Sequence, residues 1–378
     1  MKVKLSDAFD LQMGKTPPRN DRECWGDGHK WISISDIGNV GKYIDITKEE
    51  ITDIGVSKSG IKVVPKGTVI MSFKLSIGKT AITAEDMYTN EAIMAFINKG
   101  RYEINTDYLY HMCKGIDWLA GTNKAVLGLT LNKATMSEKE IVIPSMAEQL
   151  HVVSVLDKMD ELIALRKEQL AKLDQLVKSR FIELFDVQKC QKKTLGECTD
   201  FVDYRGHTPE LSDAGTIRMV NAKSVGKGFF KYVDEYVTEE TYDSWMHRGF
   251  GHPGDILFVT EGHTFGNTCL IPNDLKKFAL GQRVITIKGH QEVLNAFLCS
   301  YMQTDMFWKD INVYRTGGTA QGIRSKDLVK VYVPIPPLEQ QKQFAAFVEQ
   351  TDKSKLVIQQ SLDKLELLKE SLMQEYFG

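Results

Sequence analysis

The chain has 378 residues, of which 42% are hydrophobic and 26% charged, and its formal net charge is −2. That length allows two domains of ordinary size, and the composition is typical of a soluble globular protein. No apolar run is long enough to span a membrane, and residues 1–10 lack the apolar core of a signal peptide, so we expect a cytoplasmic protein. The near-neutral charge by itself does not indicate a nucleic-acid-binding protein.

The six cysteines show neither a CxxC pair nor a regular spacing. Disulfide frameworks and zinc sites both need cysteines at defined spacings, so the sequence indicates neither. We therefore expect isolated, reduced thiols.

The first 146 residues contain short β-like runs separated by turn residues. The clearest are residues 62–71 and 92–97, which are rich in apolar and β-branched side chains, whereas residues 106–113 favour a helix. We therefore predict an α+β domain, rich in β-structure, over residues 1–146.

A long helix is predicted over residues 147–185, because this segment contains neither Pro nor Gly. An apolar strand bounded by Pro144 leads into it. Steps of four and three residues trace a heptad seam, which is typical of a helix that pairs with another. The seam consists of Val152, Leu156, Met159, Ile163, Arg166, Leu170, Leu173, Val177, Arg180 and Leu184. With the polar connector that follows, this segment covers residues 147–190.

The second half of the chain repeats the first at a distance of 192 residues. The motif GKTP at Gly14 corresponds to GHTP at Gly206, and Pro144 corresponds to Pro336. Such a period indicates a tandem duplication and therefore two copies of one fold. In the second copy, residues 255–260 and 283–288 favour strands and residues 293–305 favour a helix, so residues 191–337 form a second predicted α+β domain.

A second long helix is predicted over residues 338–378. Its seam reproduces the first one 192 residues later, and it has polar residues at Lys355 and Lys369 just as the first has Arg166 and Arg180. Two such seams in one chain favour pairing with each other, so we predict an antiparallel coiled coil. The four polar positions are candidates for fixing the register of the pair or for contacting a partner protein.

A polar, glycine-containing loop precedes each proline-bounded strand, at residues 120–130 and 314–323. Glycine-rich segments let the backbone approach a ligand closely and offer N–H groups to anions. A connector that only leads into the strand is an equally good interpretation of these loops.

The motifs of common enzymes are missing from the sequence. The chain has no GxGxxG, GxxxxGK[ST], HExxH or GxSxG motif, and it lacks the NPPY or DPPY tetrapeptide of amino-methyltransferases. His247, His252 and His263 lie near one another in the sequence but without a carboxylate pattern, so ordinary surface histidines are favoured over a metal site. We predict neither a catalytic residue, nor a metal, nor a bound cofactor.

The duplicated chain resembles the specificity subunits of type I restriction-modification systems over essentially its whole length. The motifs that carry the resemblance are PSMAEQ at residues 144–149 and PPLEQQ at residues 336–341, the segments LSDAFDLQMGKTP and LGECTDFVDYRGHTP that open the two halves, and the tandem arrangement itself. Each motif alone is weak evidence for this family, but the same order of motifs occurs twice in the chain, which is strong evidence.

The resemblance implies that residues 1–146 and 191–337 are target recognition domains, each reading one half of a split DNA sequence. It also implies that residues 147–190 and 338–378 form the helical spacer. The partners would be double-stranded DNA, two adenine methyltransferase subunits and restriction subunits with translocase and nuclease activity. S-adenosylmethionine and ATP would belong to those partners, and the chain itself would be no enzyme.

Side-chain chemistry suggests candidates for DNA contacts, because Arg and Lys bind guanine edges and phosphates while Asn and Gln suit adenine. In the first half the candidates are Lys15, Arg19, Lys74, Lys79, Asn123 and Lys124. In the second half they are Arg205, Arg218, Arg248, Asn267, Arg315, Gln321 and Arg324. For each of them, an ordinary solvated surface residue is the competing interpretation.

Two other classes of protein compete with this interpretation. A standalone repressor or bridging protein would also read a split site, but it should show a helix-turn-helix or a basic helix, and neither is evident. A self-contained methyltransferase would need the motifs that are missing.

Overall fold

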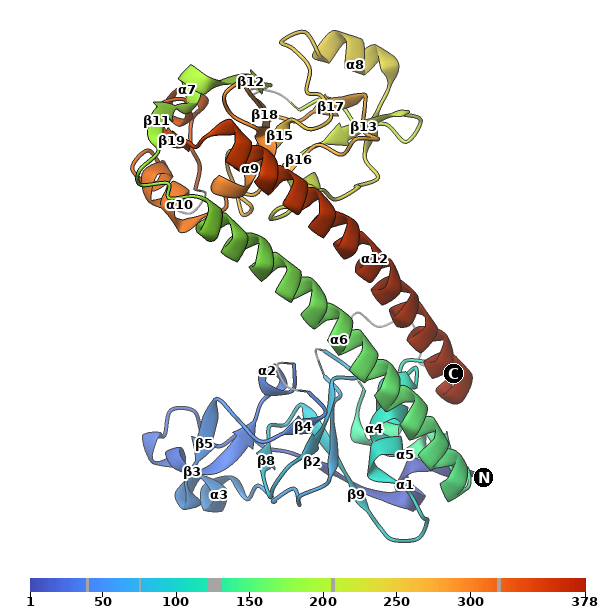
Figure 1. The fold of residues 1–378 in the computed structure, drawn as a ribbon. Helices are drawn as coiled ribbons and strands as arrows, with labels where there is room; N and C mark the ends of the chain where they lie inside the picture. Colours follow the sequence, from blue (N-terminus) through green and yellow to red (C-terminus); the bar gives the residue numbers. More distant parts are fainter. Residues whose placement is uncertain (39–40, 75, 121–130, 205–207, 318–320) are drawn as a thin grey trace. The chain divides into compact units, whose positions relative to one another are not determined.

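The computed structural model describes residues 1–38, 41–74, 76–120, 131–204, 208–317 and 321–378. The chain forms two compact units, unit 1 with Met1–Lys167 and Gln360–Gly378, and unit 2 with Glu168–Gln359. Two long helices, α6 (Met146–Leu184) and α12 (Leu338–Phe377), contribute residues to both units (Figure 1). No helix within the described ranges is long and apolar enough to cross a membrane.

Unit 1 is built on a five-stranded mixed sheet. Its strands, in spatial order, are β2 (Phe9–Met13), β9 (Ile93–Asn98), β6 (Val69–Ser72), β7 (Thr80–Thr83) and β4 (Tyr43–Ile44). Every side chain of β6 and β7 is buried, as expected for apolar strands covered on both faces. A smaller sheet has the order β5 (Glu49–Ile51), β3 (Trp25–Ile32) and β8 (Tyr88–Thr89).

The helices of unit 1 are short apart from α4 (Thr106–Gly115), which lies between the sheet and the long helices. Asn105 caps α4 by accepting a hydrogen bond from the Tyr108 amide, 3.0 Å away. Tyr108 and Met112 on α4 share one core with Val152 and Leu156 of α6, and Phe377 of α12 packs against it. The other helical segments are α1 (Leu5–Ala8), η1 (Arg22–Cys24), α2 (Ile34–Ile37), α3 (Asp53–Ser59) and α5 (Lys133–Glu138).

Unit 2 repeats this topology, except that β4 has no counterpart strand among its described residues. Its larger sheet has the order β12 (Thr199–Asp203), β18 (Val284–Gly289), β15 (Ile256–Val259) and β16 (Thr268–Leu270), the counterparts of β2, β9, β6 and β7. Its smaller sheet, β14 (Tyr236–Val237), β13 (Ile217–Val220) and β17 (Phe278–Leu280), corresponds to β5, β3 and β8, including the parallel pairing of the last two strands. The helical segments are α7 (Leu195–Cys198), η2 (Ala222–Ser224), α8 (Glu239–Trp245), α9 (Asn295–Tyr301), α10 (Asp305–Asn312) and α11 (Ser325–Leu328).

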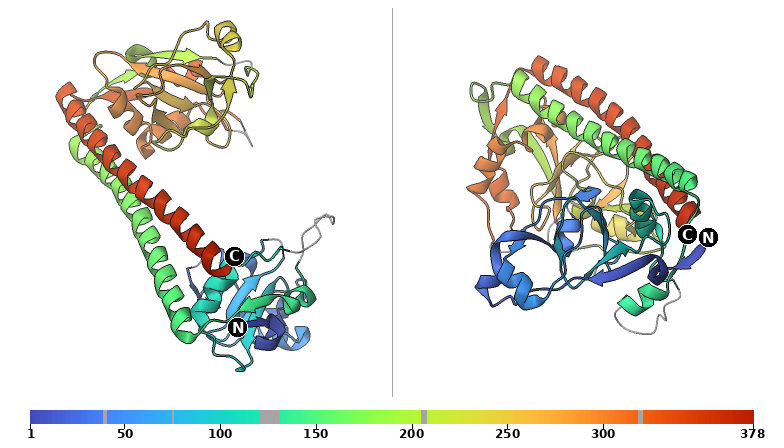
Figure 2. Two further views of the ribbon diagram at one scale, coloured as in Figure 1. Left: turned by 90° about the vertical axis from the view of Figure 1, so that its right-hand side faces the viewer. Right: turned by 90° about the horizontal axis from the view of Figure 1, so that it is seen from below.

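The start and the end of each globular part are paired in the same way. In unit 1, β1 (Lys2–Lys4) pairs antiparallel with β10 (Glu140–Val142), directly before α6. In unit 2, β11 (Gln191–Thr194) pairs antiparallel with β19 (Tyr332–Ile335), directly before α12. Both ends of the chain therefore lie in unit 1, where the views of Figure 2 show them close together.

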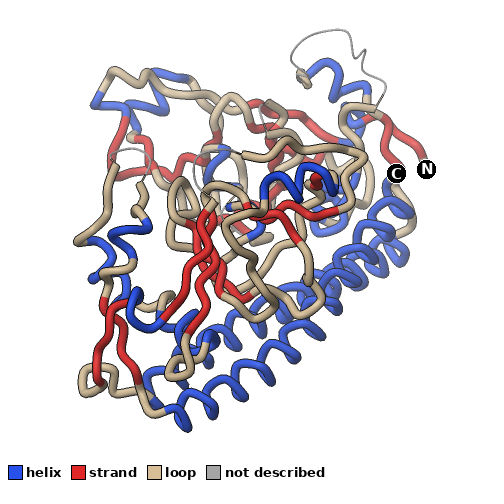
Figure 3. Tube along the Cα trace, turned by 90° about the horizontal axis from the view of Figure 1, so that it is seen from above, coloured by secondary structure: helices blue, strands red, loops and turns tan. Residues whose placement is uncertain are grey.

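The long helices α6 and α12 pack together, and the tube in Figure 3 shows them in blue, side by side. All ten seam positions predicted on α6, and their ten counterparts on α12, are buried or half-buried. In unit 1 the beginning of α6 contacts the end of α12, and in unit 2 the end of α6 contacts the beginning of α12, so the pair is antiparallel. The predicted α+β duplication with an antiparallel helix pair is confirmed.

The polar seam positions of α12 form ion pairs across the helix pair. Lys369 pairs with Asp160 in unit 1, and Lys355 pairs with Asp174 in unit 2 at 2.7 Å. Both lysines are largely buried, with exposed fractions of 19% and 27%. Their partners lie beside the α6 seam rather than on it, so the heptad pattern alone does not identify them.

Two predicted elements differ from the structure. The helix expected over residues 293–305 is shorter in the structure, where α9 covers only Asn295–Tyr301. A turn at residues 302–304 separates α9 from α10, whose N-cap is Thr304. The strand expected over residues 62–71 begins at Val69, because residues 65–68 form the turn into β6 and Val64 makes only an isolated bridge with Met87.

Candidate nucleic-acid interface and helix surface

Equivalent hairpin loops follow β6 in unit 1 and β15 in unit 2. Each closes on a glycine with positive φ, Gly78 at 89° and Gly266 at 80°. The Gly78 amide donates to the Ser72 carbonyl and the Gly266 amide to the Val259 carbonyl, both at 2.9 Å. The left-handed conformation at these positions favours glycine. The two loops thus share the hydrogen bond that closes them but carry different side chains, and the loop of unit 2 is one residue longer.

A polar groove in unit 2 is built where this hairpin loop meets the loop after α10. The Gly262 amide donates to the Gln321 carbonyl at 3.0 Å, and the Ile323 amide donates to the Thr260 carbonyl at 2.9 Å. A Cβ on Gly322 would lie 2.9 Å from the Glu261 Cβ, so only glycine fits there without a shift. The groove has a volume of about 400 Å³ and is lined by Glu261, Gly262, Arg283, Thr316, Gly317, Gly322, Ile323 and Arg324.

The charged side chains of this groove are held on rigid backbone. Arg283 directly precedes the buried strand β18, and its carbonyl accepts hydrogen bonds from the amide and the hydroxyl of Thr260, at 2.9 and 3.2 Å. The Arg283 Nε lies 3.1 Å from Glu261 Oε1, and both side chains are about half exposed, at 55% and 56%. Arg324 is exposed at the N-cap of α11. Arginine donors and a carboxylate acceptor in one groove match the polar edges of base pairs.

Of the predicted residues in unit 1, Lys74 and Lys79 both lie on the hairpin loop after β6. The Lys74 Nζ lies 5.2 Å from the ring centroid of Phe73, and the Lys79 Nζ lies close to Gly38. Lys15 is exposed and donates to the carbonyls of Ser59 and Gly60. These three lysines thus lie in two separate parts of unit 1.

Arg19 and Arg218 are engaged within their own units. The Arg19 guanidinium binds Glu49 through both Nη atoms and lies 4.0 Å from the ring centroid of Trp25. Arg218 bonds the Val233 carbonyl and the Tyr236 hydroxyl, and its side chain is only 19% exposed. Stacked and paired arginines of this kind stabilise the domain surface, so their availability to DNA depends on breaking those contacts.

The other predicted residues of unit 2 fall into two groups. Gln321 and Arg324 belong to the groove region, and Arg315 is exposed on the same loop, 3.3 Å from Asn312 Oδ1. Asn267 is the last residue of the hairpin loop after β15, and its side-chain amide donates to the Val225 carbonyl at 3.0 Å. Arg248 lies elsewhere, and its backbone amide donates to the Tyr204 hydroxyl at 2.7 Å. Asn123, Lys124 and Arg205 lie outside the described residues.

Sequence reasoning missed Arg283 and Glu261. The strand predicted over residues 283–288 begins at Arg283, and an arginine at the start of a strand carries no local sign of facing DNA. Glu261 is acidic, whereas DNA contacts favour basic and amide side chains. A comparison of the two halves would have identified Arg283 as a candidate. The residue before β9 is Ala92, whereas the equivalent residue before β18 is the charged Arg283.

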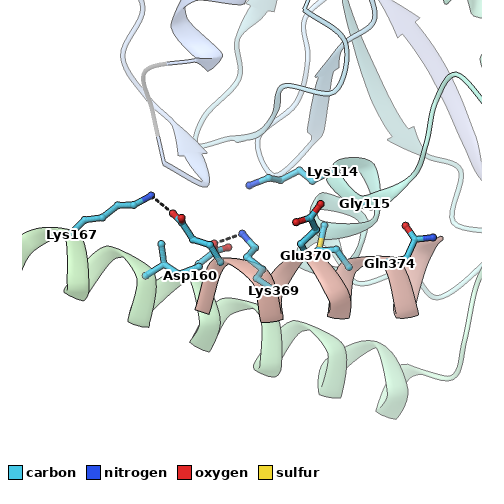
Figure 4. A pocket seen from close by; sticks show the side chains of 10 residues that line it. Lys114, Gly115, Asp160, Lys167, Lys369, Glu370 and Gln374 are labelled. Carbon is cyan, nitrogen blue, oxygen red and sulfur yellow. Dashed lines mark hydrogen bonds and ion pairs between the residues drawn. The ribbon is translucent and has the colours of Figure 1, made fainter. Parts of the chain in front are cut away.

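A second hollow lies in unit 1, between the end of α4 and the long helices (Figure 4). It has a volume of about 520 Å³, and Lys114, Asp160, Lys167, Lys369 and Glu370 are among the residues that line it. Lys167 pairs with Glu366 at 2.8 Å, and Lys369 with Asp160. Because acids and bases alternate along its walls, the hollow suits a polar protein surface better than an isolated anion.

A partly buried polar cluster, in which only His111 is fully buried, connects α4 and α6 in unit 1. His111 Nε2 lies 2.7 Å from Asp157 Oδ1, and Lys42 Nζ lies 2.8 Å from both Asp157 Oδ2 and Asp107 Oδ1. Burial holds the pKa of His111 below its ordinary value, although the hydrogen bond to Asp157 opposes this shift. The pKa of Asp157 is also lowered, because Lys42 and His111 bind its carboxylate more strongly than burial opposes its charge.

The three clustered histidines of the second half do not share a ligand set. His252 Nδ1 lies 3.6 Å from Asp255, whereas His247 Nδ1 lies 3.3 Å from the Ser244 carbonyl. In the part of the chain that the structure describes, no group of three or more His, Cys, Asp or Glu side chains is placed to hold a metal ion.

Two copies of a β-rich recognition fold joined by paired helices define a class of protein that has been characterised structurally. The S subunit of a type I restriction-modification system from M. genitalium aligns over 100% of this chain and 96% of its own, with a TM-score of 0.56 and 15% identity. A chain from a structural study of the assembly and conformational transition of the type I R-M system aligns over 100% and 97%, with a TM-score of 0.63 and 16% identity. At these identities the likeness shows the fold.

The family model "Type I restriction modification DNA specificity domain" matches residues 1–175 and again residues 189–367. The chain therefore belongs to the type I restriction-modification DNA specificity family and carries two copies of its domain.

Curated relatives agree with this membership. The EcoprrI specificity subunit of Escherichia coli is 22% identical over 387 residues, covering 93% of this chain and 87% of the relative. The MjaIX specificity subunit of Methanocaldococcus jannaschii is 29% identical over 187 residues, covering 48% of this chain. That match spans only 42% of the MjaIX subunit.

Proposed function

We propose that this chain is the non-catalytic DNA-specificity subunit of a type I restriction-modification complex. Residues 1–146 and 191–337 are its two recognition domains, and each reads one half of a bipartite DNA target. The observation that carries the proposal is that the two units repeat one strand order, apart from the edge strand β4, while their corresponding hairpin loops differ in polar side chains. Two domains with the same fold but different surface side chains are suited to binding two different DNA half-sites.

Catalysis is assigned to partner subunits. An adenine methyltransferase must extract its target base from the helix into a pocket, and the chain has none of the cofactor motifs that accompany such a pocket. We propose that two methyltransferase subunits, and restriction subunits in the full complex, act at the DNA that this chain selects.

The long helices, within residues 147–190 and 338–378, are the proposed docking surface for the methyltransferase subunits. Their outward faces expose large apolar side chains, which is unusual unless another protein covers them. On α12 these are Leu356, Val357, Leu367 and Leu368, exposed by 59%, 66%, 68% and 49%, and on α6 they include Ile182 at 73%. Charged residues alternate with them, as in the rim of a protein interface.

Co-expression with the neighbouring methyltransferase tests the function. We expect the two proteins to co-purify and to methylate adenines in one bipartite sequence, mapped by sequencing of modified DNA. Sequence-specific binding to a split site without any methylation would favour a standalone DNA-binding protein instead. Methylation without a bipartite sequence would contradict the proposal.

Docking on the helices is tested separately by the double substitution Leu367→Glu and Leu368→Glu. These side chains face outward, so the fold should be retained while co-purification with the methyltransferase is lost. The matched control is Phe229→Glu, which removes an apolar side chain exposed by 55% away from the helices. An equal loss of co-purification in the helix variant and in the control would argue against docking on the helices.

A further inference from the structure

The hairpin loops after β6 and β15 begin with equivalent backbone hydrogen bonds, so the side chains at the start of the two loops can be compared. Ser72 pairs with Ile93, and Val259 pairs with Val284. One residue further on, the Phe73 amide donates to the Ala92 carbonyl at 3.0 Å, and the Thr260 amide donates to the Arg283 carbonyl at 2.9 Å. Ala92 is thus the structural counterpart of Arg283.

The next residue of each loop differs in charge. Lys74 follows Phe73 in unit 1, and Glu261 follows Thr260 in unit 2. Unit 1 therefore has Lys74 and Ala92 at these two positions. Unit 2 has Glu261 and Arg283 there, and these two side chains form an ion pair. Because the backbone hydrogen bonds are equivalent up to Phe73 and Thr260, this exchange changes the donors and acceptors at the start of the loop.

We propose that Arg283, positioned by Glu261, is a specificity-determining residue that reads a guanine in the half-site of unit 2. The inference rests on the proposed function and adds to it the residue and the base. Arginine recognises guanine O6 and N7 through two parallel N–H donors, which requires its guanidinium plane to be fixed.

Three observations support this role for Arg283. The ion pair with Glu261 engages Nε, one of five guanidinium donors, and the other four belong to the terminal Nη atoms. The Arg283 backbone is anchored twice by Thr260, directly before a fully buried stretch of β18. The side chain nevertheless remains 55% exposed in a polar groove. A long side chain that is held at both its base and its Nε loses little further freedom when it binds.

Unit 1 should read its own half-site differently at this point. Ala92 offers no donor, and Lys74 presents a single ammonium whose three donors are not arranged as a planar fork. The equivalent positions in unit 1 therefore do not offer the planar guanidinium fork that matches guanine O6 and N7.

The test uses the complex with its methyltransferase subunits, after the bipartite sequence of the wild type has been mapped. Each base pair of both half-sites is then changed in turn, and binding of the duplexes is measured by competition for the wild-type, Arg283→Ala, Arg283→Lys and Glu261→Gln complexes. Lys288→Ala is the matched control, because Lys288 is an exposed cation on the same strand, five residues further along.

We expect the wild type to discriminate about 5- to 150-fold against replacing one G·C pair in one half-site, the range of a bidentate contact. Arg283→Ala and Arg283→Lys should both lose this discrimination at that position and keep it at every other. Glu261→Gln should weaken it at the same position, and Lys288→Ala should leave it intact.

Several outcomes would overturn the inference. A bipartite sequence without any G·C pair in either half-site would do so. An Arg283→Lys complex that keeps full discrimination at that position would do so as well, because the planar guanidinium fork would then not be what distinguishes the base pair. A uniform loss of affinity for all duplexes would also assign Arg283 to the phosphate backbone. In each of these cases the wild-type bipartite sequence would still support the proposed function, whereas its absence would overturn both.

Discussion

Replacing Phe344 tests how the long helices are held to the recognition domain of unit 2. Phe344 on α12 is fully buried, and its ring lies 5.5 Å from Phe181 and 5.4 Å from Phe185 of α6, both in edge-to-face contact. Phe297 of α9 stacks on Phe181 at 5.6 Å and so joins the same cluster. Removing a buried phenylalanine costs about 3–5 kcal/mol, since both transfer energy and packing are lost.

A single free energy of unfolding is not defined for a chain of two compact units. Hydrogen exchange is therefore the suitable measurement, because it reports the loss of stability segment by segment. A loss of about 3–5 kcal/mol corresponds to exchange faster by two to nearly four orders of magnitude. In Phe344→Ala we expect this acceleration in α9 and in the adjoining parts of α6 and α12, with little change in the β2–β9 ladder of unit 1. Phe250→Ala is the control, because that ring is 49% exposed. Acceleration below tenfold, or equal acceleration in unit 1, would refute the role of the cluster.

Three further predictions follow from the same structure. The purified chain alone should transfer no methyl groups from S-adenosylmethionine to DNA in a radiolabel assay, and any transfer above background would contradict its assignment as a specificity subunit. Exchanging residues 191–337 for those of a relative should change one mapped half-site and leave the other intact, whereas a change in both would contradict independent reading. Because the lowered pKa of His111 means that the unfolded chain takes up the proton first, unit 1 should lose stability as the pH falls below about 6.5. His111→Gln should reduce this dependence in thermal melts at pH 7.5 and 5.5, and the control His151→Gln, at an exposed position of α6, should not.

The sequence predicts the long helices well because their signal is local and repeated. A heptad seam that recurs 192 residues later, although with its basic residues at other positions, specifies helix, length and pairing together. Because of the duplication, a strand predicted in one half strengthens the prediction of its counterpart in the other half, as for β9 and β18. The turn at residues 302–304 was missed because Met302 and Thr304 occur in helices and turns alike, and the Thr304 cap is recognisable only once α10 is seen.

The candidate DNA contacts were less predictable, for a physical reason. Arg19 and Arg218 are chemically suited to bases, but tertiary structure places them on Trp25 and on two tyrosines, with partners distant in the sequence. Arg283 becomes a candidate only when a hairpin loop brings Glu261 to its Nε. Whether an arginine serves its own fold or a ligand is thus decided by contacts that local sequence does not encode.

The register of the helix pair shows how a few polar residues select one arrangement from several that a heptad seam allows. Lys369 and Lys355 lie 14 residues apart on α12, and their partners Asp160 and Asp174 lie 14 residues apart on α6, so both ion pairs belong to one antiparallel register. A slip by one heptad preserves the apolar seam. In one direction, however, it would place Lys369 opposite Lys167 and Lys355 opposite Phe181. In the other direction it would place Lys355 opposite Lys167 and Lys369 opposite Val153. Either slip breaks both ion pairs and sets one lysine against another, so charge, rather than apolar packing, fixes the register.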